Sequence, residues 1–171
     1  GDHYNDYTQV NNYLAFNDMS SFTICAWVYP TALNSNNTII SKVNPNRDFV
    51  LKLTRTGQLE AHFMHIATTY YRCTSTQTIP LNKWSHVAAS WTGTSWILYY
   101  NGSIIGTSNH AGKKPLWTGT RMGVGTMNWS EVFTGKIDSV KVFGTALTDQ
   151  EVSQVYIDTP NAKGIWQFNG N

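Results

Sequence analysis

The sequence predicts an all-β domain in which two antiparallel sheets pack face to face, a β-sandwich with one short helix. Short runs rich in β-branched and aromatic residues recur along the chain, separated by Gly, Pro, Asn and Asp. Only one segment changes to helical periodicity. The 171 residues suffice for one domain with a hydrophobic core, and no shift in composition divides the chain. We therefore expect a single domain over residues 1–171.

The expected strands follow one another at short, regular spacing. Pro30 ends the first of them, because proline is excluded from the middle of a sheet. The turn at 55–57 and Gly93 each join two neighbouring strands as a hairpin. The expected strands are residues 21–30, 37–43, 48–54, 58–65, 67–76, 83–93, 95–103, 119–125 and 131–143.

The segment TDQEVSQVY changes from the strand period to the helical one. Thr148 can cap the N-terminus of this helix, and Glu151, three residues later, completes a capping box. Val152, Val155 and Tyr156 share one face of the helix. We therefore expect one short helix that lies over a sheet edge or over the end of the sandwich.

Charge and hydropathy exclude several classes of partner. The net charge is +2 and no run of Lys or Arg occurs, which argues against nucleic acid but tolerates an acidic polysaccharide. No apolar run approaches the ~20 residues that span a bilayer, so we expect no membrane contact, and we expect a monomer. Cys25 and Cys73 could form a disulfide in a secreted domain or remain two buried thiols, and both alternatives stay open.

Four segments, in the right order, resemble a known family. NDYTQV, SFTICAWVYP, NKWSHVAASW with SWILYYNGSIIG, and FTGKIDSVKVFGTALTDQEVSQVY together resemble the laminin-G-like, concanavalin A-like jelly-roll family. The resemblance implies a concanavalin A-like jelly roll, a fold used by carbohydrate-binding modules, adhesion domains and some polysaccharide-degrading enzymes. The tail AKGIWQFNGN resembles the strand that normally starts such domains. We expect residues 163–168 to close this domain's own sheet.

Asp138 interrupts a late strand of apolar residues. Alternation places it on the same face as Val140 and Val142, where an ionised carboxylate is costly unless it is paired. The family resemblance implies a structural Ca²⁺, an ion that takes oxygen ligands, held by this aspartate and the N-terminal segment, where Asp2 and Asp6 are the available carboxylates. In the alternative, Asp138 accepts hydrogen bonds from backbone N–H groups at a bend of the strand.

The acidic residues argue against a hydrolase. Glycosidases on this fold need two or three carboxylates alternating along one strand, and the ten acidic residues form no such cluster. Glu60 is alone on its strand, and Glu131 is alone in a loop. His62 and His65 would point to opposite faces of a sheet, which argues against zinc. We therefore expect no enzymatic activity, and a small polysaccharide lyase or hydrolase is the remaining catalytic alternative.

Aromatic residues in polar loops are candidates for sugar contact, because sugar rings stack on aromatic faces while polar groups bind the hydroxyls. Trp117 and Trp129 lie in polar, Gly-containing loops, and Asn128 could add hydrogen bonds beside the second. In the alternative, each indole covers an end of the sandwich.

The segment ATTYYRCTST is a further candidate for sugar contact. Tyr70 and Tyr71 point to opposite faces of a strand, so one of them must leave the core. Arg72 shares the face of Tyr70 and could bind a carboxylate or sulfate through two hydrogen bonds. In the alternative, this is an edge strand with ordinary cross-strand aromatic pairs.

The concave face of one sheet is the other candidate surface. Alternation in DFVLKLT and QLEAHFMH turns the leucines and phenylalanines inward and leaves Lys52 and His62 facing outward. Tyr99, together with His86, would complete a polar, aromatic and mildly basic groove that suits an extended anionic glycan. In the alternative, this is an ordinary solvated face.

Together these features predict a non-catalytic carbohydrate-binding module that targets a polysaccharide, with an anionic or sulfated one as a candidate. We expect it to be appended to a polysaccharide-degrading enzyme that is secreted or held at the cell surface. The alternative from another class is a cell-surface adhesion domain that binds proteins, which predicts a flat hydrophobic or calcium-rimmed surface and no affinity for sugars.

Overall fold

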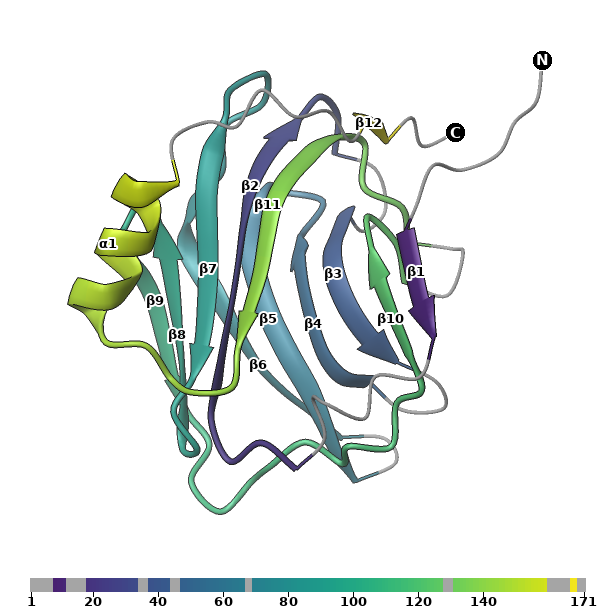
Figure 1. The fold of residues 1–171 in the computed structure, drawn as a ribbon, viewed down its shortest axis with the longest axis vertical. Coiled ribbons are helices and arrows are strands. Elements are labelled where there is room, and N and C mark those ends of the chain that lie inside the picture. Colours follow the sequence, from purple (N-terminus) through teal and green to yellow (C-terminus); the bar gives the residue numbers. More distant parts are fainter. Residues whose placement is uncertain are drawn as a thin grey trace.

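A computed structural model confirms the β-sandwich (Figure 1). It describes residues 8–11, 18–33, 37–43, 47–66, 69–127, 131–159 and 167–168, the first and last of these ranges by their backbone alone. Within this part of the chain the strands form two antiparallel sheets of six strands each, sheet A and sheet B. One short helix, α1 (Asp149–Asp158), lies beside sheet B.

Each sheet combines strands that follow one another in the sequence with strands from distant parts of the chain, as in a jelly roll. Sheet A runs in the order β1 (Thr8–Asn11), β10 (Arg121–Val124), β3 (Asn37–Val43), β4 (Arg47–Leu53), β5 (Gln58–Ile66) and β6 (Thr69–Thr78). Sheet B runs in the order β12 (Gln167–Phe168), β11 (Gly135–Phe143), β2 (Phe22–Pro30), β7 (Ser85–Trp91), β8 (Ser95–Tyr100) and β9 (Ser103–Asn109). Among the described residues, no helix has the length and apolar character needed to cross a membrane.

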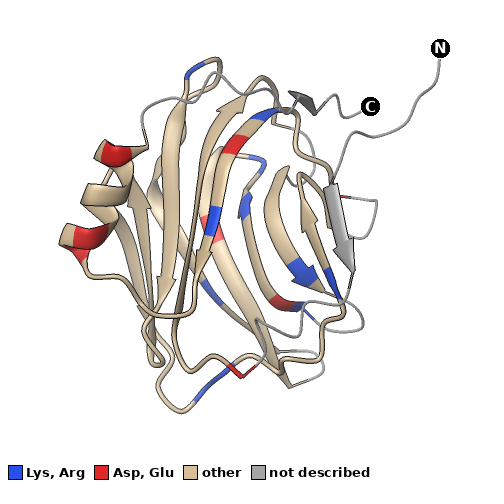
Figure 2. Ribbon diagram, viewed as in Figure 1, with Lys and Arg blue, Asp and Glu red and all other residues tan. Residues whose placement is uncertain are grey.

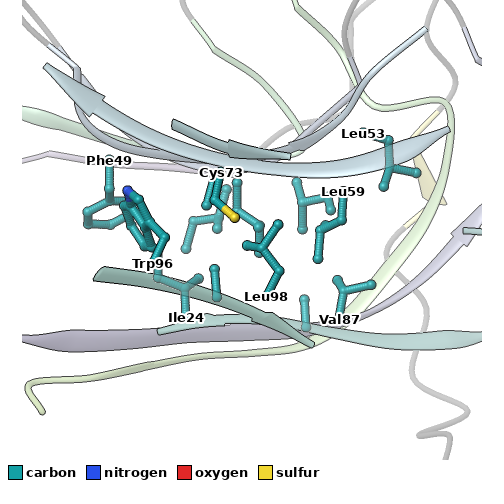
Figure 3. Close-up of a cluster of buried hydrophobic side chains, with 14 of the residues drawn as sticks. Ile24, Phe49, Leu53, Leu59, Cys73, Val87, Trp96 and Leu98 are labelled. Carbon is teal, nitrogen blue, oxygen red and sulfur yellow. The ribbon is translucent and has the colours of Figure 1, made fainter. Parts of the chain in front are cut away.

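The inner faces of the two sheets share one hydrophobic core. Figure 3 shows Phe49, Leu53 and Leu59 of sheet A pointing toward Ile24 and Leu98 of sheet B, and all five side chains are fully buried. The alternation predicted for β4 and β5 is therefore confirmed. Each residue between these core positions faces away from the core, on what we call the outer face of sheet A.

The helix begins as predicted and packs on the outer face of sheet B. Thr148 caps it, and the side chain of Glu151 accepts a hydrogen bond from the Thr148 backbone, which completes the capping box. Val152 of α1 packs with Cys25 and Tyr99 in a second, smaller hydrophobic cluster. α1 therefore covers part of sheet B.

A β-bulge in β11 overturns the premise that Asp138 faces the core with Val140 and Val142. Asp138 lies opposite Trp27 of β2, but the register then shifts, and Ser139 takes a positive φ of 49°. One extra residue reverses the direction of the side chains that follow it. Val140 and Val142 therefore pack against the core, while Asp138 faces outward from sheet B.

The two cysteines are free and buried on different sides of the fold. Cys73 belongs to the main core, whereas Cys25 lies in the cluster beneath α1. Burial raises the pKa of the Cys25 thiol to about 11, although the nearby Lys141 acts in the opposite direction. Of the two alternatives for Cys25 and Cys73, a disulfide or two buried thiols, the structure therefore shows two buried thiols.

The last strand pairs with the beginning of β11. Gly135 lies opposite Phe168, and Lys136 lies opposite Gln167, which places β12 at an edge of sheet B. Residues 163–166 of the expected closing strand lie outside the described residues. That this tail closes the domain, and does not begin another one, stays a prediction.

Candidate functional site

The outer face of sheet A holds a buried, charged cluster around Glu60. Antiparallel register places Lys52 of β4 and Thr74 of β6 opposite Glu60 of β5. The Lys52 Nζ lies 3.6 Å from Glu60 Oε1, and the Thr74 hydroxyl donates to Glu60 Oε2 at 3.2 Å. His62 completes this cluster through a 3.1 Å hydrogen bond from its Nδ1 to Glu60 Oε1. We call these four residues the Glu60 cluster.

The cluster fixes the charge state of its two buried titratable groups. Burial opposes ionisation of Glu60, but the hydrogen bond from His62 and the charges of Lys52 and Arg72 together lower its pKa to about 2. Burial lowers the pKa of His62, with Glu60 acting in the opposite direction. At neutral pH, Glu60 is therefore ionised and His62 is neutral, with its proton on Nδ1. The buried Nε2 of His62 has no hydrogen-bond partner among the described residues.

Tyr70 brings two arginines together above this cluster. Its ring meets the edge of the His62 ring at a centroid distance of 5.4 Å. The guanidinium carbons of Arg47 and Arg72 lie 5.2 and 5.8 Å from the centre of the Tyr70 ring. Tyr70 is half-buried and Arg72 is exposed. The surface thus combines an aromatic ring with two planar cations that can bind carboxylate or sulfate oxygens. We call Arg47, Tyr70 and Arg72 the Tyr70 site.

The segment after β10 adjoins the same face. Met127 packs against Val43 and Val50 on the outer face of sheet A. The backbones of Met127 and Glu131 exchange hydrogen bonds of 3.2 and 3.4 Å, and Glu131 Oε1 lies 3.8 Å from Arg47. The predicted contacts Asn128 and Trp129 fall between these two anchored positions. Both lie outside the described residues, so their role stays a prediction.

Trp117 corrects the expectation of a ligand platform. Its indole is 9% exposed and packs edge-on against the ring of Phe22 at 5.5 Å. The Nζ of Lys42 lies 5.5 Å from the same indole and forms a buried ion pair with Asp48. Asp48 also accepts hydrogen bonds from two backbone N–H groups, those of residues 118 and 119, which fixes the loop that carries Trp117. Trp117 therefore covers the end of the core.

Tyr99 is a second correction, because it lies on the other sheet. It is fully buried on the outer face of sheet B, under α1, and its hydroxyl donates to Asp149 Oδ1 at 2.8 Å. His86 lies on the same side of sheet B, 5.6 Å from Trp27 between ring centroids. Alternation correctly predicted that both side chains face outward. However, β7 and β8, which carry them, belong to sheet B, and α1 covers part of that sheet. Neither residue can join Lys52 and His62.

The structure thus joins Lys52, His62, Tyr70 and Arg72 from the predicted set, whereas Tyr71 lies on the other side of β6. Glu60 was missed because its partners come from neighbouring strands. A register counted outward from the hairpin turn at 55–57 gives the Lys52–Glu60 pair. No sequence pattern indicated Arg47 or Glu131 as site residues. A β-bulge positions Arg47, and a loop positions Glu131.

Asp138 combines one hydrogen-bonded carboxylate oxygen with a second one that suits a cation. Its Oδ1 accepts a 2.6 Å hydrogen bond from the Ser139 backbone N–H, as the alternative interpretation expects. Its Oδ2 is buried and has no hydrogen-bond partner among the described residues, which leaves an oxygen suited to a hard cation. The described ranges hold no group of three metal-binding side chains, and the other expected ligands, Asp2 and Asp6, lie outside them.

Known proteins share this fold. A family profile described as the concanavalin A-like lectin/glucanases superfamily matches residues 2–153. A heptameric SAP-like pentraxin from Limulus polyphemus is 22% identical with a TM-score of 0.69, over 88% of this chain and 75% of that one. The binding domain of Paraclostridial Mosquitocidal Protein 1 is 15% identical with a TM-score of 0.71, over 88% of this chain but 40% of that one. No match was found among curated protein sequences.

A bound sugar is present in one similar structure, the CBM40 module of a Ruminococcus gnavus IT-sialidase with alpha2,3 sialyllactose. It is 22% identical with a TM-score of 0.66, over 80% of this chain and 82% of that one. At these identities the likeness establishes the fold alone. Several of the similar structures are described as binding domains or as a CBM40 module.

Proposed function

This chain belongs to the concanavalin A-like lectin/glucanases superfamily, and we propose on that premise that it binds carbohydrate through the outer face of sheet A. One observation carries the proposal. The half-buried ring of Tyr70 is flanked by Arg47 and Arg72 and rests on the buried Glu60 cluster. An aromatic ring on a rigid polar support, with two cations beside it, can offer apolar contact to a sugar ring and hydrogen bonds to its polar groups.

The ligand that suits this surface is a polysaccharide with acidic groups. Three cations, Arg47, Lys52 and Arg72, face two carboxylates, Glu60 and Glu131, so the surface keeps an excess positive charge while His62 is neutral. Glu60 is itself occupied by three partners. Arg72 is exposed and extends beyond the cluster, where a carboxylate or sulfate group can reach it.

The module is proposed to be non-catalytic. A glycosidase needs a carboxyl group whose pKa is raised so that it can donate a proton. The pKa of Glu60 is lowered instead, and Glu131 is paired with Arg47. We propose a monomeric module that is tethered to a polysaccharide-degrading enzyme and acts outside the cell or at its surface. The likeness to a sialidase module supports this arrangement.

Removal of the Tyr70 ring tests the proposed site. We expect Tyr70→Ala to weaken binding to acidic polysaccharides about tenfold, because the contact with the ring and the position of both arginines are lost together. Affinity gel electrophoresis followed by calorimetry measures the effect. Tyr29→Ala is the matched control, because Tyr29 is also a half-buried tyrosine beside a lysine but lies on sheet B. The affinity of Tyr29→Ala for acidic polysaccharides should stay within about twofold of that of the wild type.

Two results would contradict the proposal. If a folded wild-type protein binds no neutral or acidic polysaccharide, the function is wrong. If Tyr29→Ala weakens binding as much as Tyr70→Ala does, the function stands but the site is wrong.

A structural Ca²⁺ at Asp138 is proposed as well, supported by the family fold and by its Oδ2, which has no hydrogen-bond partner among the described residues. Asp138 would supply that oxygen, and Asp2 and Asp6 would be further ligands. We expect calcium at about ten times its dissociation constant to raise the midpoint of thermal unfolding by a few degrees relative to chelator. Asp138→Asn should abolish this shift, whereas Asp158→Asn, which removes an exposed carboxylate from α1, should keep it. An equal shift in both variants would exclude Asp138 as a ligand.

A further inference from the structure

A second basic and aromatic surface lies on the other side of strand β6. The ring of Tyr71 is approached by Lys113, whose Nζ lies 5.5 Å from the ring centre. The rings of His65 and His110 meet it edge-on at centroid distances of 5.8 and 5.4 Å. Lys114 follows in the same loop and is exposed. We call these five residues the rim patch.

The rim patch is held in place by hydrogen bonds to two strands of sheet A. The Nδ1 of His65 in β5 lies 2.8 Å from the carbonyl oxygen of Lys114 and 3.3 Å from its backbone nitrogen. His110 donates from Nε2 to the carbonyl of Arg72 in β6 at 3.0 Å. The loop between these contacts is therefore anchored at both ends, which holds Lys113 over Tyr71 and leaves Lys114 exposed beside it.

The rim patch and the Tyr70 site share the same edge strand. Tyr70 and Tyr71 are consecutive, so their rings leave β6 on opposite sides. Arg72 links the two surfaces, because its guanidinium lies over Tyr70 while its carbonyl holds His110. Neither β6 nor the loop at 110–120 contains an acidic residue. Figure 2 shows basic positions in blue on the loop after β9.

We propose that the rim patch is a second anion-binding subsite, and that the ligand is an extended acidic glycan chain that crosses β6. This inference rests on the proposed function. One sugar unit packs beside Tyr70 with its acidic group at Arg72, and a later unit of the same chain places its acidic group at Lys113 and Lys114. Carboxylate and sulfate ester groups share the chemistry that these cations bind. Two linked subsites make binding depend on chain length, because the second contact becomes intramolecular.

The test compares oligosaccharides of increasing length by calorimetry. Oligogalacturonides supply carboxylates, carrageenan oligosaccharides supply sulfate esters, and cello-oligosaccharides are neutral. We expect octamers of at least one acidic series to bind wild-type protein about tenfold more tightly than dimers, after correction for the larger number of positions at which a longer chain can bind. The double variant Lys113→Ala/Lys114→Ala should lose most of this gain while its affinity for the dimers is unchanged. The series that shows the gain identifies the acidic group.

Lys83→Ala/Lys136→Ala is the matched control, because it removes the same charge outside both surfaces and should keep the gain. The gain should also fall as salt rises, since exposed charges are screened. The inference is overturned if affinity does not grow with chain length, if the rim variant keeps the full gain, or if the control loses it. Tight binding of neutral chains alone would leave the proposed function standing and overturn the acidic ligand. Absence of binding in every series would overturn the proposed function itself.

Discussion

Asp48→Asn is expected to lower the free energy of unfolding by about 3–5 kcal/mol, the range measured when one partner of a buried ion pair is removed. The side chains of Lys42 and Asp48 are both fully buried, and their charged atoms are 2.5 Å apart. Asp48 Oδ2 accepts from the Gly119 backbone N–H at 2.8 Å, and Oδ1 accepts from that of Thr118 at 3.0 Å. The substitution leaves the lysine charge uncompensated and loosens the loop that seats Trp117.

Urea denaturation followed by tryptophan fluorescence measures this loss. Glu131→Gln is the control, because Glu131 forms a longer and partly exposed ion pair with Arg47, which should contribute less than about 1 kcal/mol. A second variant separates charge from packing. Lys42→Met combined with Asp48→Asn removes the uncompensated charge, so it should be more stable than Asp48→Asn alone. If the double variant is less stable than the single one, the electrostatic explanation is wrong.

Acidification is expected to destabilise the protein through His86. Burial lowers the pKa of His86 to about 4, and the charge of Lys141 acts in the same direction. The unfolded chain therefore takes up a proton below pH 6.5 that the folded protein does not bind until about pH 4. The stability that neutral His86 contributes is complete above pH 6.5 and is lost as the pH falls toward 4. At 1.36 kcal/mol for each pKa unit, this loss is about 3 kcal/mol.

Protonation of Glu60 lowers the stability of the folded protein further at more acidic pH. Its pKa is about 2 in the folded protein and 4.5 in the unfolded chain, so its contribution to stability is present above pH 4.5 and disappears between pH 4.5 and 2.

Urea denaturation between pH 7 and pH 4 tests the contribution of His86 separately. His86→Gln should lose about 3 kcal/mol less than wild type over that interval, with the remaining decline due to other groups. Parallel pH profiles for the two proteins would show that His86 does not titrate as proposed.

The two-residue period of strands made much of the architecture predictable. It gave the inward direction of Leu59 and Phe63 and the outward direction of Lys52 and His62, because successive side chains of a strand leave on opposite faces. The capping box at Thr148 was readable for a similar reason, since its hydrogen bonds join residues three positions apart. Such local rules depend on no other part of the chain.

The same two-residue period did not predict the surroundings of a residue wherever a non-local contact intervened. The bulge at Ser139 reversed the expected direction of Asp138 relative to Val140, because one added residue changes the face of every residue after it. Tyr99 points outward as its strand predicts, yet the packing of α1 buries it. Trp117 lies in a polar loop, yet the buried ion pair beneath it draws that loop onto the core.

By itself, the sequence determined the sandwich, its core-facing positions, the capped helix and the absence of paired catalytic carboxylates along any strand. Only the tertiary structure decided which outward residues meet. Lys52, Glu60 and Thr74 come together through the register of three antiparallel strands, and Arg47 reaches Tyr70 across the same two strand pairings. A strand pattern fixes the side on which a residue lies, whereas its neighbours on that side depend on strand order and register, which distant segments of the chain set together.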